Sequence, residues 1–350
     1  MAQYIFKRKT FIKNINMLTD AFSEQNVNFE IFYSVKTNFS KPVLDTVNKH
    51  CHFEVVSAYE WTLIKEYRPK ELVLNGPSKT KTLVRDILDS SVEKLFFNID
   101  NDTDILIIEN LEKKYLKKIV IGLRVYLNRP GIWNRFGYDI NSKRADEVII
   151  KFGKKLQGFH FHFSTNNFSI NNYSAMFDEI NKKIAEHKLK LQYVDIGGGL
   201  PGADEMLYQK TMYKELPELV KKFSPKNVLI ISEVGRNLVE NAFDLETEIV
   251  STKELDNGTI DIVIDANIMH FPCFWEKKYS IEYVAYNGAQ KRPTTVNIFG
   301  NSCMQIDKIA ESYLITNVPV VGDRILLSKV GAYSLSQASN FISKIPDITE

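Results

Sequence analysis

A chain of 350 residues can bury a large hydrophobic core and should form one large or two medium domains. Hydrophobic residues make up 44% of it and charged residues 25%, which is typical of a globular protein. Its 45 basic and 43 acidic side chains leave a net charge of +2 without long runs of one sign, which argues against nucleic-acid and membrane partners and favours a small-molecule partner.

The sequence shows neither a targeting segment nor a cysteine pair. The start of the chain, Met1 to Tyr4, lacks the basic and apolar regions of a signal peptide, and no apolar run approaches the roughly 18 residues of a membrane span. Three cysteines, Cys51, Cys273 and Cys303, are widely spaced and form no CxxC pair, which argues against a disulfide framework and a zinc site. We therefore expect a cytoplasmic protein without a metal centre.

Short β-branched or aromatic runs alternate with longer segments of helical period from residue 28 to about 235, which indicates repeated βα units. The runs predict eight strands, at 29–36, 52–57, 72–76, 94–99, 119–125, 156–163, 191–199 and 227–235. Apolar residues at three-to-four spacing predict helices at 11–23, 41–50, 80–88, 102–116, 141–152, 171–187 and 204–223. Eight parallel strands with helices between them close into a (β/α)8 barrel of the TIM type, whose active site lies at the carboxyl ends of the strands.

Beyond residue 240 the pattern changes to strands without long helices, predicted at 243–252, 260–266, 294–300 and 324–334. The segment 4–6 is too short for a domain and is expected to add a strand to this β unit. The sequence thus predicts an α/β barrel domain at residues 12–242, followed by a β domain at residues 243–350 that includes residues 1–11.

Several predicted strand ends carry chemically useful residues. Lys36 ends the first strand, and its amine can form an imine, although a solvated lysine is commoner at such a place. The glycines at 197–199 follow the seventh strand and can form a backbone nest for an anion, although a tight turn alone also explains them. Glu233 ends the eighth strand beside that turn, and His160 and His162 share one face of the sixth. A zinc role for the histidines lacks further ligands in that strand, so stacking or hydrogen bonding is favoured.

An imine-forming lysine, a phosphate nest, a flat side chain that can stack and an acid for a ring nitrogen are together what pyridoxal phosphate (PLP) requires. The chain resembles the fold-type III PLP-dependent decarboxylases, the group of ornithine, diaminopimelate and carboxynorspermidine decarboxylases, over almost its whole length. The matching motifs follow in the order of that family: YSVKTN (33–38), FEVVS (53–57), NGPSKT (75–80), GLRV (122–125), RFG (135–137), HFH (160–162), GGG (197–199), EVGR (233–236), DA (265–266), GNSCM (300–304), GD (322–323) and GAY (331–333).

The resemblance implies PLP as the cofactor and a role for each matching residue. Lys36 would bind PLP covalently, His162 would stack on its ring, and Arg124 would lie near the ring hydroxyl. The phosphate would be held by Thr165, Gly197, Gly198, Gly199, Gly235, Arg236 and Tyr333.

Glu233 would pair with the pyridine nitrogen and, by keeping it protonated, would let the ring accept the electron pair left when CO₂ departs. Alanine racemases of the same fold place an arginine there, so Glu233 favours decarboxylation by a PLP-dependent carboxy-lyase.

Cys303 matches the cysteine that, in this family, reaches the reacting carbon from across a dimer interface. A buried cysteine acting as a small hydrophobe is the alternative, but the flanking Gly300, Ser302 and Asp307 favour catalysis. The resemblance therefore implies a homodimer with two shared active sites.

The substrate-binding residues differ from the best-known branches of the family. Diaminopimelate decarboxylases place an arginine in the segment that corresponds to 266–279, where this chain has none, and ornithine decarboxylases have an aspartate where this chain has Met304. With Met304, the proposed substrate-binding residues are Asp265, His270, Trp275 and Glu276. We expect an L-amino acid with an extended side chain, such as a carboxylated polyamine or an aminocarboxypropyl-bearing intermediate of polyamine or secondary metabolism.

Three alternatives stay open at this stage. They are an amino-acid racemase on the same fold, a decarboxylase of the diaminopimelate or ornithine type, and a non-catalytic PLP-binding regulator. The β domain and Cys303 count against the regulator, because single-domain barrel proteins of that kind lack both.

Overall fold

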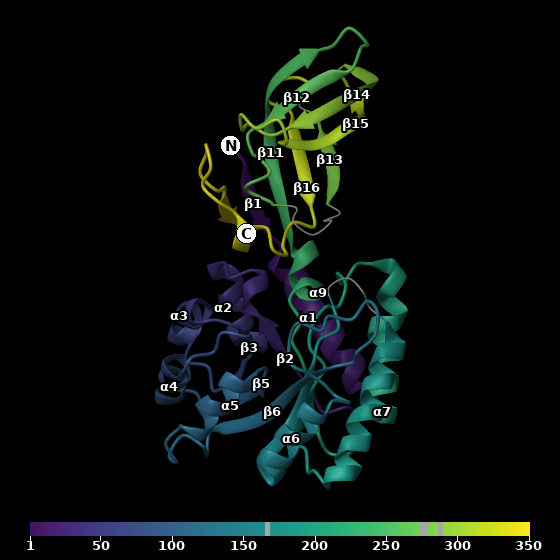
Figure 1. The fold of residues 1–350 in the computed structure, drawn as a ribbon. Helices are drawn as coiled ribbons and strands as arrows, with labels where there is room; N and C mark the ends of the chain where they lie inside the picture. The colour runs from purple at the N-terminus through teal and green to yellow at the C-terminus, as the bar shows by residue number, and fades with distance from the viewer. Residues whose placement is uncertain (165–168, 273–278, 286–289) are drawn as a thin grey trace. The chain divides into compact units, whose positions relative to one another are not determined.

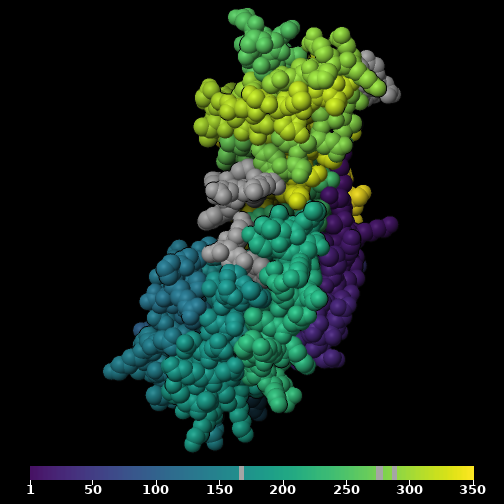
Figure 2. All heavy atoms as spheres, turned by 90° about the vertical axis from the view of Figure 1, so that its right-hand side faces the viewer, coloured from purple at the N-terminus to yellow at the C-terminus, as the bar shows by residue number. Residues whose placement is uncertain are grey.

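The computed structural model describes residues 1–164, 169–272, 279–285 and 290–350 (Figure 1). The chain divides into two compact units. One is Ile12–Leu238, the barrel unit, and the other joins Met1–Phe11 to Val239–Glu350, the β unit. Figure 2 shows the first mainly in purple to teal and the second mainly in green to yellow. None of the helices in the described ranges combines the length and the hydropathy that crossing a membrane requires.

The barrel unit contains a closed ring of eight parallel strands, as the sequence predicts. In ring order they are β5 (Lys94–Ile99), β4 (Glu71–Leu74), β3 (His52–Val55), β2 (Phe29–Ser34), β10 (Leu229–Ser232), β9 (Tyr193–Asp195), β8 (Leu156–Phe161) and β6 (Ile119–Tyr126). The pairing of β5 with β6 closes the ring, and a short strand, β7 (Tyr138–Asp139), pairs with β6 outside it. Because all eight ring strands are parallel, their carboxyl ends meet at one end of the barrel.

The α-helices that lie wholly or mostly in the described part of this unit are α1 (Arg8–Ser23), α2 (Lys41–His50), α3 (Ala58–Ile64), α4 (Lys81–Asp89), α5 (Asp102–Glu109), α6 (Lys143–Phe152), α7 (Ile170–His187), α8 (Leu216–Phe223) and α9 (Arg236–Val239). Polar caps explain several starts. The Thr80 hydroxyl accepts from the Leu83 amide at the start of α4, and the Ser142 hydroxyl accepts from the Ala145 amide at the start of α6.

Two helix predictions need correction. The predicted helix 102–116 ends at Glu109, since Asn110 and the turns after it leave the helical conformation. The predicted helix 204–223 is helical only in parts, a 3-10 turn at Met206–Tyr208, a π turn at Thr211–Glu215 and then α8. The sequence prediction missed α3, a helix short enough for its period to be inconspicuous.

The barrel interior is filled by large side chains from successive strands. A buried cluster comprises Phe32, Val73, Phe96, Val120, Tyr193, Leu229 and Ile231. The rings of Phe96 and Tyr193 meet edge to face with centroids 4.9 Å apart. Glycines on neighbouring strands make room for Tyr193, because a Cβ on Gly158 would lie 2.1 Å from its ring and one on Gly122 would lie 2.1 Å from its hydroxyl.

The β unit is built on a mixed sheet in the order β13 (Ser280–Val284), β16 (Arg324–Ser328), β11 (Phe243–Glu254), β12 (Ile260–Ile264), β14 (Lys291–Phe299) and β15 (Lys308–Asn317). The N-terminal strand β1 (Gln3–Phe6) pairs with β11, as expected for residues 4–6, and with β17 (Asp347–Thr349). The sequence prediction missed β13, β15 and β17. The exposed, charged residues of β13 and β15 give an apolar pattern too weak to detect.

Candidate active site

Lys36 lies at the carboxyl end of β2, but not on the strand. The predicted strand 29–36 ends at Ser34, and Val35–Thr37 forms a 3-10 turn. Thr37 of this turn packs closely on Gly235, since a Cβ on Gly235 would lie 1.9 Å from the Thr37 hydroxyl. The Lys36 ammonium donates to the Ser34 hydroxyl at 2.7 Å and to Oε2 of Glu54 at 3.1 Å. The lysine side chain is 43% exposed, whereas Glu54 is fully buried. A buried carboxylate thus holds a partly accessible amine at the barrel mouth.

Glu233, directly after β10, is buried among partners from three other strands. Its Oε2 lies 3.4 Å from Nε2 of His160 on β8, and its Oε1 accepts from the side-chain amide of Asn75, which follows β4. Asp195, at the end of β9, is also fully buried, and its Oδ1 accepts from the Gly197 amide at 2.9 Å. The sequence argument against a metal site considered only the strand of the histidines, whereas Asp195 on the neighbouring β9 and Glu233 after β10 place two carboxyl groups beside His160.

The two carboxyl groups ionise differently. Burial, and then the charge of Glu233, raise the pKa of Asp195 well above its usual range. Burial alone would also raise the pKa of Glu233, but His160 and the hydrogen bond from Asp195 lower it well below its usual range. Within this buried pair the proton is therefore favoured on Asp195 and the negative charge on Glu233.

A buried chain of hydrogen bonds leads from the core to Glu233. The Tyr193 hydroxyl donates to Oδ1 of Asn98 at 2.5 Å, Nδ2 of Asn98 donates to Oδ1 of Asn75 at 2.9 Å, and Asn75 donates to Glu233. Each of these side chains is at most 8% exposed. A buried network in which every member has a partner fixes the position of its last group.

His162 follows β8 and contacts the glycine turn. Its Nδ1 accepts a hydrogen bond from the Gly198 amide at 3.2 Å. Burial, and then the positive charge of Arg124, lower the pKa of His162 to about 3. The ring of Trp133 lies 5.7 Å from the imidazole, centroid to centroid. His162 is thus a neutral, flat ring, held by a backbone amide.

The glycines at 197–199 are required by close approach and by backbone conformation. Gly197 and Gly199 have φ angles of 67° and 81°, and a Cβ on Gly197 would lie 2.3 Å from the carbonyl oxygen of Phe161. A Cβ on Gly198 would lie 2.4 Å from the carbonyl oxygen of Glu233. The turn therefore brings backbone amides against two neighbouring strand ends, where a side chain could not fit.

The remaining predicted barrel residues lie near this end as well. Arg124 on β6 lies 3.5 Å from Asp100, nitrogen to oxygen, and its guanidinium stands over the Phe136 ring at 4.8 Å. Gly235 lies between β10 and α9, and the buried Arg236 is the first residue of α9. Thr165 lies outside the described residues.

The other predicted residues belong to the β unit. Cys303 is exposed, and the loop before it is organised by Asp307, which accepts from the Ser302 amide at 2.9 Å. Tyr333 has a left-handed backbone with φ of 61°. Met304 is half-buried, Asp265 accepts from the Glu248 amide, and His270 is buried, with burial lowering its pKa. Trp275 and Glu276 lie outside the described residues.

Sequence reasoning gave no role to Glu54, Asn75, Asn98, Tyr193 or Asp195. Glu54 and Asn75 lie within quoted motifs, and each of the five lies in or directly after a predicted strand. A search for polar residues at the carboxyl ends of predicted strands would have found Glu54, Asn75 and Asp195.

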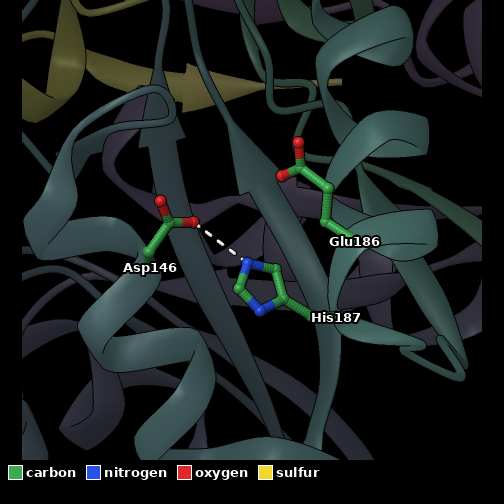
Figure 3. A group of neighbouring side chains, drawn as sticks. All are labelled: Asp146, Glu186 and His187. Carbon is green, nitrogen blue, oxygen red and sulfur yellow. Dashed lines mark hydrogen bonds and ion pairs between the residues drawn. The ribbon is translucent and has the colours of Figure 1, made fainter.

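Two groups of described residues have a composition that could hold a metal ion. One is His160, Asp195 and Glu233. The other, Asp146, Glu186 and His187, joins α6 to α7 (Figure 3). There Asp146 already accepts from Lys183 at 2.6 Å and contacts His187 at 3.1 Å, so its carboxylate is engaged by an ammonium group.

The barrel residues fit PLP. A partly exposed amine, a neutral ring and a turn of backbone amides converge at one barrel end with an ionised carboxylate. A model of the pyridoxal-binding domain of pyridoxal-dependent decarboxylases matches residues 9–240. The chain belongs to this family.

Related decarboxylases agree with this assignment. Diaminopimelate decarboxylase of Campylobacter jejuni is 23% identical over 361 aligned positions, covering 96% of this chain and 88% of the relative. Among solved structures, diaminopimelate decarboxylase of M. jannaschii, in complex with L-lysine, has a TM-score of 0.83 at 22% identity, covering 100% of this chain and 87% of that one. The arginine decarboxylase of Paramecium bursaria Chlorella virus has a TM-score of 0.80 at 19% identity, covering 99% and 95%.

The family membership determines the class of reaction. The chain is a PLP-dependent decarboxylase, a carboxy-lyase of the amino-acid decarboxylase family. The structural relatives, at these low identities, establish the fold, a barrel followed by a β domain.

Proposed function

We propose that this decarboxylase acts on an L-amino acid or amino-acid derivative with an extended side chain, such as a carboxylated polyamine or an aminocarboxypropyl-bearing intermediate. The observation that carries the choice of decarboxylation over racemisation is the ionised Glu233, held by His160 and Asn75. Bound PLP would supply an electron sink. A carboxylate beside its ring nitrogen keeps that nitrogen protonated, which strengthens the ability of the ring to accept electrons.

Lys36 is the proposed point of attachment of the cofactor. Its ammonium must lose a proton before it can act as a nucleophile. Glu54 and Ser34 are placed to accept that proton, because the Ser34 hydroxyl donates to Glu54 at 2.6 Å and accepts from Lys36. We assign ring stacking to His162, whose neutral imidazole brings no charge to the pyridine face.

Phosphate binding is assigned to the 197–199 turn and Gly235, with Arg236, Thr165 and Tyr333, while Arg124 is assigned to the ring hydroxyl. The support is the close packing at Gly197, Gly198 and Gly199, which lets the backbone of the turn approach a ligand where a side chain could not fit. The Gly197 and Gly198 amides already donate to Asp195 and His162.

Cys303 is proposed to act on the reacting carbon of a neighbouring subunit, in a homodimer with two shared sites. Its exposed, free thiol agrees with a reactive group and with a reducing compartment, the cytoplasm.

The substrate proposal rests on the charges at the substrate-binding positions. A distal carboxylate in a closed site needs a cationic partner, because an unpaired buried charge costs several kcal/mol. The segment 266–279 contains no arginine, its two lysines, Lys277 and Lys278, lie outside the described residues, and Met304 is apolar. An extended substrate side chain with an amine or a neutral end suits the other proposed substrate-binding residues, Asp265, His270, Trp275 and Glu276.

A substrate panel tests the proposal. Purified holoenzyme should release CO₂ from carboxynorspermidine or an aminocarboxypropyl compound with kcat/KM about 100-fold above that for meso-diaminopimelate, lysine or ornithine. Optical rotation, followed in parallel, separates decarboxylation from racemisation. Efficient turnover of meso-diaminopimelate, at kcat/KM above about 10⁴ M⁻¹s⁻¹, would refute the substrate proposal and would require another cation, such as Arg129 or Arg135, to replace the missing arginine.

A further inference from the structure

A cavity of about 970 Å³ opens at the end of the barrel opposite the active site. Its lining includes Lys94, the first residue of β5, and Ile119, the first residue of β6, together with Gln192 just before β9. Because the strands are parallel, their first residues lie at the amino-terminal end of the barrel, whereas Lys36 and Glu233 follow the last residues of their strands. The cavity is therefore separate from the PLP site.

The charges that line the cavity are unequal. Five lysines contribute, Lys94, Lys117, Lys151, Lys154 and Lys155, against two glutamates, Glu93 and Glu109. Both glutamates are neutralised, because Glu93 pairs with Lys70 at 2.5 Å and Glu109 pairs with Lys151 at 2.8 Å. Lys94 lies 3.7 Å from Glu71.

Three exposed lysines are left, Lys117, Lys154 and Lys155, for which the described part of the chain provides no ion pair. Three positive charges around one concave surface attract an anion.

Lysines near the carboxyl end of a helix are common, because they interact favourably with its dipole. That explanation covers Lys151, in the last turn of α6, and extends to Lys154 and Lys155 just after it. It does not cover Lys117, which comes from the connection between α5 and β6, eight residues beyond Glu109. Lysines from two separate connections line the same cavity.

The rest of the lining is mostly apolar. Ile108, Ile119, Val120, Ile121 and Phe152 are each at most 8% exposed, and Leu116 is 38% exposed. The amides of Gln157 and Gln192 add hydrogen-bonding groups. A concave surface of this volume that combines apolar and polar side chains suits a small molecule, and its basic side chains favour one that carries several negative charges.

We propose that this cavity is a binding site for a nucleoside polyphosphate, a ligand that combines a flat heterocycle with a strongly anionic group. The phosphates contact Lys117, Lys154 and Lys155, and the heterocycle packs against Leu116 within reach of Gln157.

The test uses holoenzyme saturated with PLP, so that the phosphate site at the barrel mouth is filled, and ATP as the probe. Calorimetry should show saturable binding with a dissociation constant between micromolar and millimolar. Substitution of Lys117, Lys154 and Lys155 by Gln should weaken binding on the order of tenfold or more, and substitution of the same three by Arg should retain it. The matched control replaces the exposed lysines Lys13, Lys49 and Lys81 of the same unit by Gln, which changes the net charge equally but does not touch the cavity.

Partial probes distinguish the two halves of the ligand. Adenosine and inorganic triphosphate should each bind more weakly than ATP. The substitution Leu116→Asn should weaken the binding of ATP but not the binding of triphosphate. No saturable binding of ATP, or an equal loss in the control variant, would overturn the proposal. Equal affinity for triphosphate and ATP, unchanged by Leu116→Asn, would overturn the assignment of a nucleoside.

Discussion

At the scale of single residues, the ionisation of the barrel mouth follows from which carboxyl groups have partners. Asp195 and Glu233 are both buried, and they differ because Glu233 also accepts from Asn75 and contacts His160. Ionising both of two interacting buried carboxyl groups costs free energy because their charges repel. The group with more stabilising partners therefore keeps the negative charge. The negative charge proposed to pair with the PLP ring nitrogen is therefore set by residues such as Asn75 and His160, to which no direct part in the reaction is assigned.

Glu233→Gln is expected to retain bound PLP and to lose several orders of magnitude in kcat, because the neutral amide cannot keep the ring nitrogen protonated. Each tenfold loss corresponds to about 1.4 kcal/mol of transition-state stabilisation. Steady-state CO₂ release measures the effect, and Tyr193→Phe, which removes the far end of the buried network, should cause a smaller loss. A Glu233→Gln enzyme within a few-fold of wild type would show that the nitrogen has another partner.

Lys36→Ala should remove both turnover and the visible absorbance of covalently attached PLP, after dialysis to remove free cofactor. Lys41→Ala is the control, because Lys41 is exposed and pairs with Asp45 on its own helix. A yellow, active Lys36→Ala enzyme would contradict the assignment.

At the scale of elements, loops and helices depend on a few contacts between neighbours along the ring. The glycine turn after β9 packs on the ends of β8 and β10, and the Asp146 carboxylate joins α6 to α7 (Figure 3). A substitution that disrupts the first contact should weaken PLP binding. A substitution that disrupts the second should lower the free energy of unfolding.

Gly198→Ala should weaken PLP binding by about tenfold or more, because the new Cβ would lie 2.4 Å from the Glu233 carbonyl oxygen and displace the turn. Equilibrium dialysis followed by absorbance gives the affinity. Gly258→Ala is the control: Gly258 has φ of 81° in a turn with open space around it, so its substitution strains the backbone but should leave PLP affinity unchanged. Equal losses in both variants would mean that general destabilisation, not the turn, governs binding.

Asp146→Asn should lower the free energy of unfolding by about 1–2 kcal/mol at pH 7, because the buried Lys183 loses its closest acceptor. Burial opposes ionisation of Asp146, but hydrogen bonds from Lys183 and His187 lower its pKa in the folded state. A lowered folded-state pKa gives stability that is present above the unfolded pKa of about 3.9. It is lost as the pH falls through the lowered value.

The difference in free energy of unfolding between wild type and Asp146→Asn should therefore become smaller as the pH falls. Urea unfolding between pH 7 and 3 measures it. Asp178→Asn, an exposed position on the same helix as Lys183, should change little at any pH. A difference that stays constant down to pH 3 would assign the loss to packing instead of charge.

At the scale of the whole molecule, the chain has two units and each carries proposed catalytic residues, Lys36 in the barrel unit and Cys303 in the β unit. Closed C₂ dimers are the commonest assemblies of identical chains, and they allow one subunit to complete the site of the other.

Complementation tests the shared site. Lys36→Ala and Cys303→Ala should each be inactive alone, and a mixture allowed to exchange subunits should recover about a quarter of wild-type activity, since half of the dimers are mixed and each has one intact site. Size-exclusion chromatography with light scattering gives the oligomeric state. A mixture that stays inactive although its subunits exchange would place Lys36 and Cys303 of one site in the same chain.

The sequence alone determined the eight-stranded barrel, the strand-end residues Lys36, His162 and Glu233, and the family, because each depends on local information. Strand period, helix period and contiguous motifs such as YSVKTN are all read from neighbouring positions. The 3-10 turn at Lys36 was missed, since the packing of Thr37 on Gly235 joins residues far apart in the chain.

Only the tertiary structure decided the charge state of Glu233 and the cavity at the far end of the barrel. Asn75 and Glu233 are 158 positions apart, and Lys117 and Lys155 come from separate connections. Such groups meet only when the ring of strands closes. Protonation and cavity shape depend on distances through space, and these are set by barrel closure rather than by any local pattern.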